Sequence, residues 1–117
     1  MISIIDDDAA VREMLVSLVR SLGYDAVSFD SAESFLANED FERFTCAITD
    51  IHMPGLSGFD LKERLDERKS LVPVIMITAQ TEPDLEERAR SQGVLGFMRK
   101  PLEIELLISY LKTAVGH

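Results

Sequence analysis

The sequence predicts an α/β fold built on a doubly wound parallel sheet, and three observations lead to that class. Short apolar runs alternate with segments of helical periodicity along the 117 residues. The connections between these segments are short, so successive strand–helix units imply a parallel sheet with right-handed crossovers. Three of the runs are almost continuously apolar, which is expected when helices cover both faces of a sheet.

Five strands and five helices are predicted in alternation. The strands share apolar side chains and are expected at residues 2–5, 26–29, 45–49, 72–78 and 94–98. Helical spacing of apolar residues is carried by Val11 to Leu22, Phe35 and Leu36, Leu61 and Leu65, residues 83–92, and Leu106 to Val115. Gly23 and Gly93 are expected to end the first and fourth helices, and Ser31 to cap the second.

Length and composition indicate one globular domain over residues 1–117, with 46% hydrophobic residues. No stretch approaches the roughly 18–20 apolar residues of a membrane span, and no export signal precedes the first strand. A net charge of −9 argues against direct binding of nucleic acid, which needs clustered Lys and Arg. The lone Cys46 is expected to be a small buried side chain, and a chain without paired cysteines fits the cytoplasm.

Acidic residues follow two of the predicted strands. Asp6, Asp7 and Asp8 come directly after the first strand, and Asp50 follows the third. Ligands bind at the carboxyl ends of the strands in open α/β sheets, so these acids are expected to share one pocket. Their mutual repulsion makes such a pocket costly unless a cation occupies it.

Two further strand ends contribute a hydroxyl and an ammonium group. Thr78-Ala79 follows the fourth predicted strand, and Lys100-Pro101 follows the fifth. The third strand is followed by a further motif, Asp50-Ile51-His52-Met53-Pro54 with Gly58. Together these motifs resemble the receiver domain of two-component response regulators, and the resemblance covers this chain from Ile2 to about Val115. The resemblance implies a flavodoxin-like fold with strand order 2-1-3-4-5. Each motif is weak alone, and their specificity comes from the ordered combination.

The resemblance also implies roles for these residues. Asp50 is expected to be the phosphoacceptor, with the Thr78 hydroxyl and the Lys100 ammonium group contacting the phosphoryl oxygens. Asp6 and Asp7 match the acidic pair that binds Mg²⁺ together with Asp50. Of the pair, Asp7 is expected to be the direct ligand and Asp6 to act through water. The backbone carbonyl of His52 falls where the family supplies another ligand.

Other positions have a structural interpretation beside the functional one. Asp8 is expected to be the N-cap of the first helix. Phe97 matches the family's switch position, where an aromatic ring turns inward on activation, and an ordinary core phenylalanine is the alternative. The side chains of His52 and Gln80 are expected beside the path of the water that hydrolyses the acyl phosphate. The alternative is that both are exposed and inert.

Two segments narrow the resemblance to a subgroup. Residues 31–36 and 51–58 are similar to those of FixJ-type transcriptional regulators, in which a helix-turn-helix output domain usually follows the receiver. The chain ends at Val115-Gly116-His117, where a linker would begin, so the sequence is expected to be a stand-alone receiver or a fragment.

The function implied is a phosphorylation-activated switch rather than an enzyme acting on a separate metabolite. The expected partners are a sensor histidine kinase and, through the face of the fourth helix, fifth strand and fifth helix, a second copy of the chain. Two alternatives fit less well. A flavin-binding module needs a phosphate-cradling loop where Asp6, Asp7 and Asp8 would repel phosphate. A hydrolase with an aspartyl nucleophile usually has a second acid two residues on, where this chain has His52.

Overall fold

The predicted alternation of strands and helices is confirmed. A computed structural model describes residues 1–38 and 43–115. The strands are β1 (Ile2–Ile5), β2 (Ala26–Phe29), β3 (Cys46–Asp50), β4 (Val74–Thr78) and β5 (Gly96–Arg99). The helices are α1 (Ala9–Ser21), α2 (Ala32–Leu36), α3 (Gly58–Glu67), α4 (Asp84–Ser91) and α5 (Ile104–Val115).

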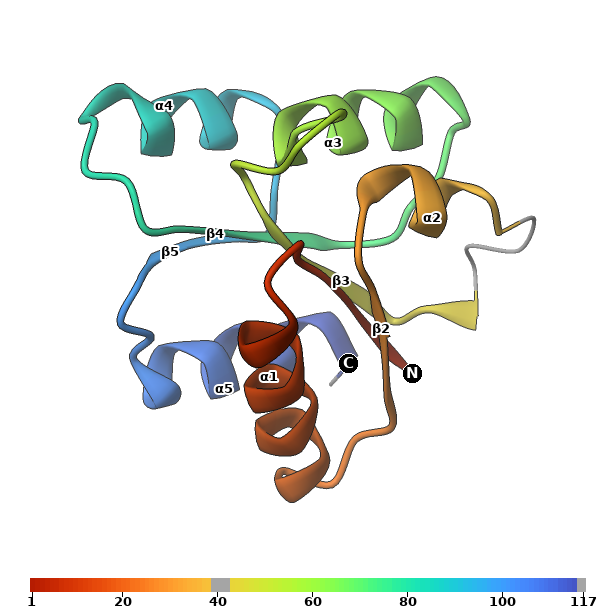
Figure 1. Cartoon of the computed structure of the whole chain (residues 1–117), viewed down its shortest axis with the longest axis vertical. Helices are drawn as coiled ribbons and strands as arrows, with labels where there is room; N and C mark the ends of the chain where they lie inside the picture. The colour runs from red at the N-terminus through yellow and green to blue at the C-terminus, as the bar shows by residue number, and fades with distance from the viewer. Residues whose placement is uncertain (39–42, 116–117) are drawn as a thin grey trace.

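The sheet separates two helical layers. All neighbouring strands pair in parallel, in the order β2-β1-β3-β4-β5, as the resemblance implied. Helices α2, α3 and α4 cover one face, and α1 and α5 cover the other (Figure 1). Alternate strand residues enter two cores: Ile5 and Met76 face α2–α4, whereas Ile4 and Ile75 face α1 and α5. Because both faces are buried, the central strands are apolar throughout.

Three of the strands differ in their bounds from the prediction. The third is Cys46–Asp50 rather than residues 45–49, so Asp50 is the last residue of the strand instead of following it. The fourth strand begins at Val74 rather than at residue 72, because Pro73 has no N–H to donate and contributes only its carbonyl, to the Ala47 N–H. The fifth runs from Gly96 to Arg99 rather than over 94–98, because its register pairs Gly96 with Ile75. The shift places Arg99 inside the strand and Lys100 immediately after it.

The helix ends follow the predicted capping chemistry. The Asp8 carboxylate accepts hydrogen bonds from Ala10 N and Val11 N, so Asp8 is the N-cap of α1. Ser31 caps α2 in the same way by accepting from Ser34 N. Gly23 and Gly93 follow α1 and α4 with φ values of +96° and +75°, a region that favours glycine. Among the described residues, no helix has the length and apolar character needed to cross a bilayer.

Candidate functional site

Three carboxylates converge at the carboxyl edge of the sheet. Strands β1 and β3 are parallel neighbours, so the residues at and after their ends meet at one edge. One oxygen from each of Asp6, Asp7 and Asp50 can be chosen such that all three lie within 4.8 Å of one another. Asp6 is 2% exposed and Asp50 9% exposed, whereas Asp7 faces solvent. Asp6, Asp7 and Asp50 therefore lie together at one edge of the sheet, as predicted, whereas Asp8, which was expected with them, does not belong to the cluster.

Every polar group of Asp6 has a partner. Its N–H donates to the Phe29 carbonyl over 3.1 Å, and its own carbonyl accepts from an Arg12 Nη over 2.7 Å. One carboxylate oxygen accepts from Asp8 N over 2.9 Å, and the other lies 3.5 Å from Lys100 Nζ. Asp6 is thus held rigidly, while Asp8 contributes the N-cap and lies outside the cluster of three acids.

Lys100 joins the acids from the far end of the chain. Its Nζ lies 3.5 Å from Asp6 Oδ2 and 3.9 Å from Asp50 Oδ2, so a single ammonium group bridges the two buried carboxylates. The Lys100 N–H donates to the Thr78 carbonyl over 2.8 Å, and the Lys100–Pro101 peptide bond is cis. The end of β5 is therefore attached to the end of β4 beside the acids.

Asp50 lies where its charged form is disfavoured. Burial, followed by repulsion from Asp6, raises the pKa of its carboxyl above the ordinary value. Lys100 and the backbone N–H groups of Ile51 and His52 oppose this shift but do not cancel it. A cation at this edge would offset the repulsion and favour the carboxylate form.

The donor set fits Mg²⁺. The three carboxylates provide hard oxygen ligands. Asp6 and Asp7 are consecutive residues after β1, and the Asp6 carboxylate is held by the Asp8 N–H. Ligand oxygens about 2.1 Å from one Mg²⁺ are at most about 4.2 Å apart. The oxygens of this cluster lie within 4.8 Å of one another, so the three acids would hold a single ion either directly or, as expected for Asp6, through a water ligand of the ion.

Gly58 allows the loop after β3 to fold closely over the end of the strand. A Cβ atom at Gly58 would lie 2.6 Å from the Asp50 carbonyl oxygen and 3.0 Å from the Ile51 Cα. The Gly58 N–H donates to the Ile51 carbonyl, and Ser57 with Asp60 forms a capping box at the start of α3. Only glycine fits this approach, which explains its place in the motif after Asp50.

Thr78 lies at the same edge but faces inward. It is fully buried, and its Oγ1 accepts from Gln80 N over 3.0 Å. The side chains of Gln80 and His52 are both exposed. These two residues therefore occupy surface positions on the loops that follow β4 and β3, and their effect on hydrolysis stays a prediction.

Phe97 packs in the core below the β4–α4 loop. It is 7% exposed and belongs to the same apolar cluster as Leu85 and Ala89 of α4. The Arg99 guanidinium lies over the ring, 5.0 Å from its centroid, and donates to the Glu82 carbonyl over 3.1 Å. An inward aromatic ring is compatible with both interpretations of Phe97, the switch and the core residue.

Sequence reasoning missed the contacts of Arg12 and Arg99. Neither arginine belongs to a motif at a strand end, and each binds a backbone carbonyl, which the sequence pattern does not identify. The position of Arg12, one turn into the helix after the acids, is the only feature that could have drawn attention to it.

Comparison with known proteins identifies close relatives. Residues 2–112 match the response regulator receiver domain family. The chain is 34% identical to the transcriptional regulatory protein FixJ of Bradyrhizobium diazoefficiens over 114 residues, which are 97% of this chain and 56% of FixJ. It is 36% identical to the response regulator protein TmoT of Ectopseudomonas mendocina over 115 residues, 98% of this chain and 52% of TmoT. The chain thus spans about half the length of these relatives.

Solved structures show the same similarity. A crystal structure of FixJ-N superposes with a TM-score of 0.87 at 30% identity, covering 99% of this chain and 93% of that one. The response regulator StyR superposes with a TM-score of 0.90 at 34% identity, covering 97% and 58% of the two chains. The match along nearly the whole sequence, on a shared five-stranded fold, establishes that this chain belongs to the response regulator receiver domain family.

Proposed function

We propose that this receiver is switched by phosphorylation of Asp50, with a histidine kinase as the phosphoryl donor. The observation that carries the proposal is that Asp50 lies beside the acids Asp6 and Asp7 and 3.9 Å from the Lys100 ammonium group. The buried acid Asp6 and the exposed acid Asp7 supply a cation site beside it, and Lys100 supplies a fixed positive charge.

The chemistry is a phosphoryl transfer between two nucleophiles. A carboxylate oxygen of Asp50 attacks the phosphorus of a phosphohistidine, forming the O–P bond of an acyl phosphate as the P–N bond breaks. The departing imidazole keeps the electron pair of that bond and takes up a proton. Lys100 lies close enough to pair with a phosphoryl oxygen as a point charge, and bound Mg²⁺ neutralises phosphoryl charge during the transfer.

The added group changes the charge that the strand ends must accommodate. A phosphoryl group carries about −1.5 to −2 charges and three acceptor oxygens. The Thr78 hydroxyl, now an acceptor for Gln80 N, is then drawn toward a phosphoryl oxygen as a donor. Movement at Thr78 alters the packing of Phe97 and the face formed by α4, β5 and α5. Few apolar residues anchor α4, where only Leu85 and Ala89 are buried.

The partner assignments follow from the family and from the surface near the site. An apolar patch of Met14, Leu18, Pro101, Leu102 and Ile104 lies beside Lys100. Met14 is 49% exposed and Ile104 52% exposed, which supports docking of a donor protein next to Asp50. A homodimer through the α4–β5–α5 face, control of transcription and action in the cytoplasm remain predictions.

Small phosphoryl donors test the proposal without a partner. The protein is incubated with acetyl phosphate and Mg²⁺, and its intact mass is measured with and without excess EDTA. We expect a gain of one phosphoryl group that requires the metal. A protein whose mass is unchanged under conditions that phosphorylate another receiver would contradict the proposed function.

A further inference from the structure

We propose that Arg12 is a positioning residue for the cation site, because it fixes the peptide unit that joins Asp6 to Asp7. The inference rests on the proposed function, since it assigns a role at the same site. Arg12 does not belong to the acid cluster. Its side chain acts instead on the backbone from which two of the three acids project.

Arg12 holds the loop between β1 and α1 at two points. An Arg12 Nη donates to the Asp6 carbonyl over 2.7 Å, and the Arg12 backbone N–H donates to the Asp8 carbonyl over 3.0 Å. The Asp6 carbonyl belongs to the peptide plane that contains the Asp7 nitrogen. The short bond from the guanidinium therefore fixes the rotation of that plane and the direction in which the Asp7 backbone leaves it.

Asp7 depends on this support more than the other acids do. The Asp6 carboxylate has its own partners in Asp8 N and Lys100, so its position does not require Arg12. The Asp7 carboxylate faces solvent and has no hydrogen-bond partner within residues 1–38 and 43–115. The direction of its side chain is thus determined mainly by the backbone, which Arg12 constrains.

A competing electrostatic effect has the opposite sign. A guanidinium group close to a cation site repels a divalent ion, so charge alone predicts tighter Mg²⁺ binding when Arg12 is removed. Positioning predicts weaker binding. The short bond from Arg12 is aimed at a backbone carbonyl rather than at a carboxylate of the cluster, and Arg12 is half-buried, so we expect the positioning effect to dominate.

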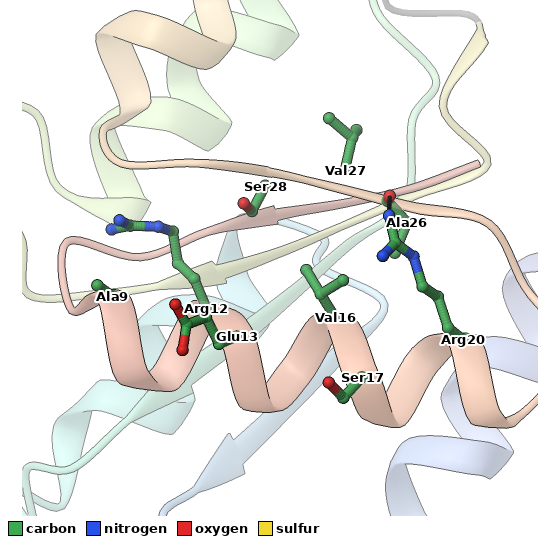
Figure 2. Close-up of a pocket in the computed structure, with 9 residues that line it drawn as sticks. All are labelled: Ala9, Arg12, Glu13, Val16, Ser17, Arg20, Ala26, Val27 and Ser28. Carbon is green, nitrogen blue, oxygen red and sulfur yellow. Dashed lines mark hydrogen bonds between the residues drawn. The ribbon is translucent and has the colours of Figure 1, made fainter.

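Arg20 provides an internal control. Arg12 and Arg20 line one groove of about 580 Å³ between α1 and β2, and their guanidinium groups lie at opposite ends of it (Figure 2). Arg20 also donates to a backbone carbonyl, that of Ala26 over 3.2 Å, but at the end of β2 remote from the acids. The two arginines thus share helix, charge and type of bond. They differ in their distance from the cation site and in exposure, since Arg12 is half-buried and Arg20 is exposed.

The experiment compares Mg²⁺ affinity in matched variants. Arg12→Met and Arg20→Met keep the apolar stem and remove the charge and the donor, whereas Arg12→Lys and Arg20→Lys keep both. Mg²⁺ dissociation constants are measured by calorimetric titration, and stability by urea unfolding without metal. For Arg12→Met we expect binding about tenfold weaker, as for other residues that orient metal ligands. Arg12→Lys should bind Mg²⁺ about threefold more weakly, which is half of the Arg12→Met effect when both are expressed as binding free energies. Both Arg20 variants should bind Mg²⁺ as tightly as the wild type.

The possible results distinguish failure of the positioning role of Arg12 from failure of the proposed function. Absence of Mg²⁺ binding in the wild type contradicts the proposed function itself. Wild-type binding combined with equal or tighter binding in Arg12→Met overturns only the positioning role. If Arg12→Met does not fold, the Lys pair decides: a dissociation constant of Arg12→Lys equal to that of Arg20→Lys overturns the inference. Loss of stability alone, with Mg²⁺ affinity unchanged, assigns Arg12 a purely structural role and equally overturns it.

Discussion

The two halves of the carboxyl edge are stabilised in different ways. At the ends of β1 and β3, three carboxylates crowd together, and Asp6 is fixed by hydrogen bonds from every side. At the ends of β4 and β5, the buried Thr78 hydroxyl and Lys100 occupy the edge, and the Phe97 ring of β5 is buried in the core. The acidic half is thus held in place at Asp6, and it is electrostatically unfavourable. The other half supplies the positive charge that partly compensates it.

This difference indicates a division of roles. The acidic half has the properties of a binding site, because its geometry exists before any ligand arrives and its repulsion is relieved by a cation. The β4–β5 half has the properties of a responsive element, because the Thr78 hydroxyl and the Lys100 ammonium group can exchange their present partners, Gln80 N and the carboxylates of Asp6 and Asp50, for phosphoryl oxygens.

The largest expected effect concerns the exposed acid of the cluster. Asp7→Asn should weaken Mg²⁺ binding at least tenfold, since it replaces a charged ligand by a neutral one. Without metal the same variant should be more stable by roughly 1 kcal/mol, because it removes repulsion between neighbouring acids. Asp8→Asn is the matched control: it removes the same charge one residue away and keeps a good N-cap. Equal losses of Mg²⁺ affinity in both variants would show that overall charge, and not the cluster, binds the ion.

The second effect concerns the buried acid of β3 and its dependence on pH. Because burial raises the pKa of Asp50 in the folded state, protonation of this group favours folding. The contribution is fully present below the unfolded pKa of about 3.9 and is lost as the pH rises through the folded pKa. In metal-free protein, Asp50→Asn should therefore increase the free energy of unfolding at pH 7 by roughly 1 kcal/mol. This gain should shrink as the solution is acidified.

Urea unfolding from pH 4 to pH 8 measures the effect. Glu63→Gln removes one exposed carboxylate from α3 and serves as the control for net charge. A stability gain of Asp50→Asn that stays constant over this range, or that equals the gain of the control, would be inconsistent with a raised pKa of Asp50.

The smallest effect concerns the two exposed side chains beside the site. Replacing both His52 and Gln80 by Ala should change the rate of dephosphorylation several-fold, because Gln80 can orient a water by hydrogen bonds and His52 can act as a base near neutral pH. Mg²⁺ binding should be almost unchanged, since the backbone carbonyl of His52 remains. The loss of phosphorylated protein is followed over time in wild type and double variant, and superimposable decay curves would show that these side chains are inert.

The sequence predicted the layers of this fold better than the contacts that complete the site. Periodicity and capping residues located the elements, because burial on one side of a helix is recorded directly in the residue pattern. The predicted starts of β4 and β5 were wrong by two residues, because strand pairing depends on register with a neighbour. The acids were identified because strand ends meet at one edge. The bond from Arg12 to the Asp6 carbonyl was not predicted, because every residue has a backbone carbonyl and the residue type therefore does not show which one a donor will bind.

The measurement that tests the account most directly is the location of the phosphoryl group. Wild-type protein is treated with acetyl phosphate and Mg²⁺, the acyl phosphate is reduced with borohydride, and the modified residue is mapped by peptide mass spectrometry. The account predicts modification at Asp50 alone, and an Asp50→Asn variant that gains no phosphoryl mass because its amide is a poor nucleophile. A phosphoryl group mapped to another residue of the wild-type protein would contradict it.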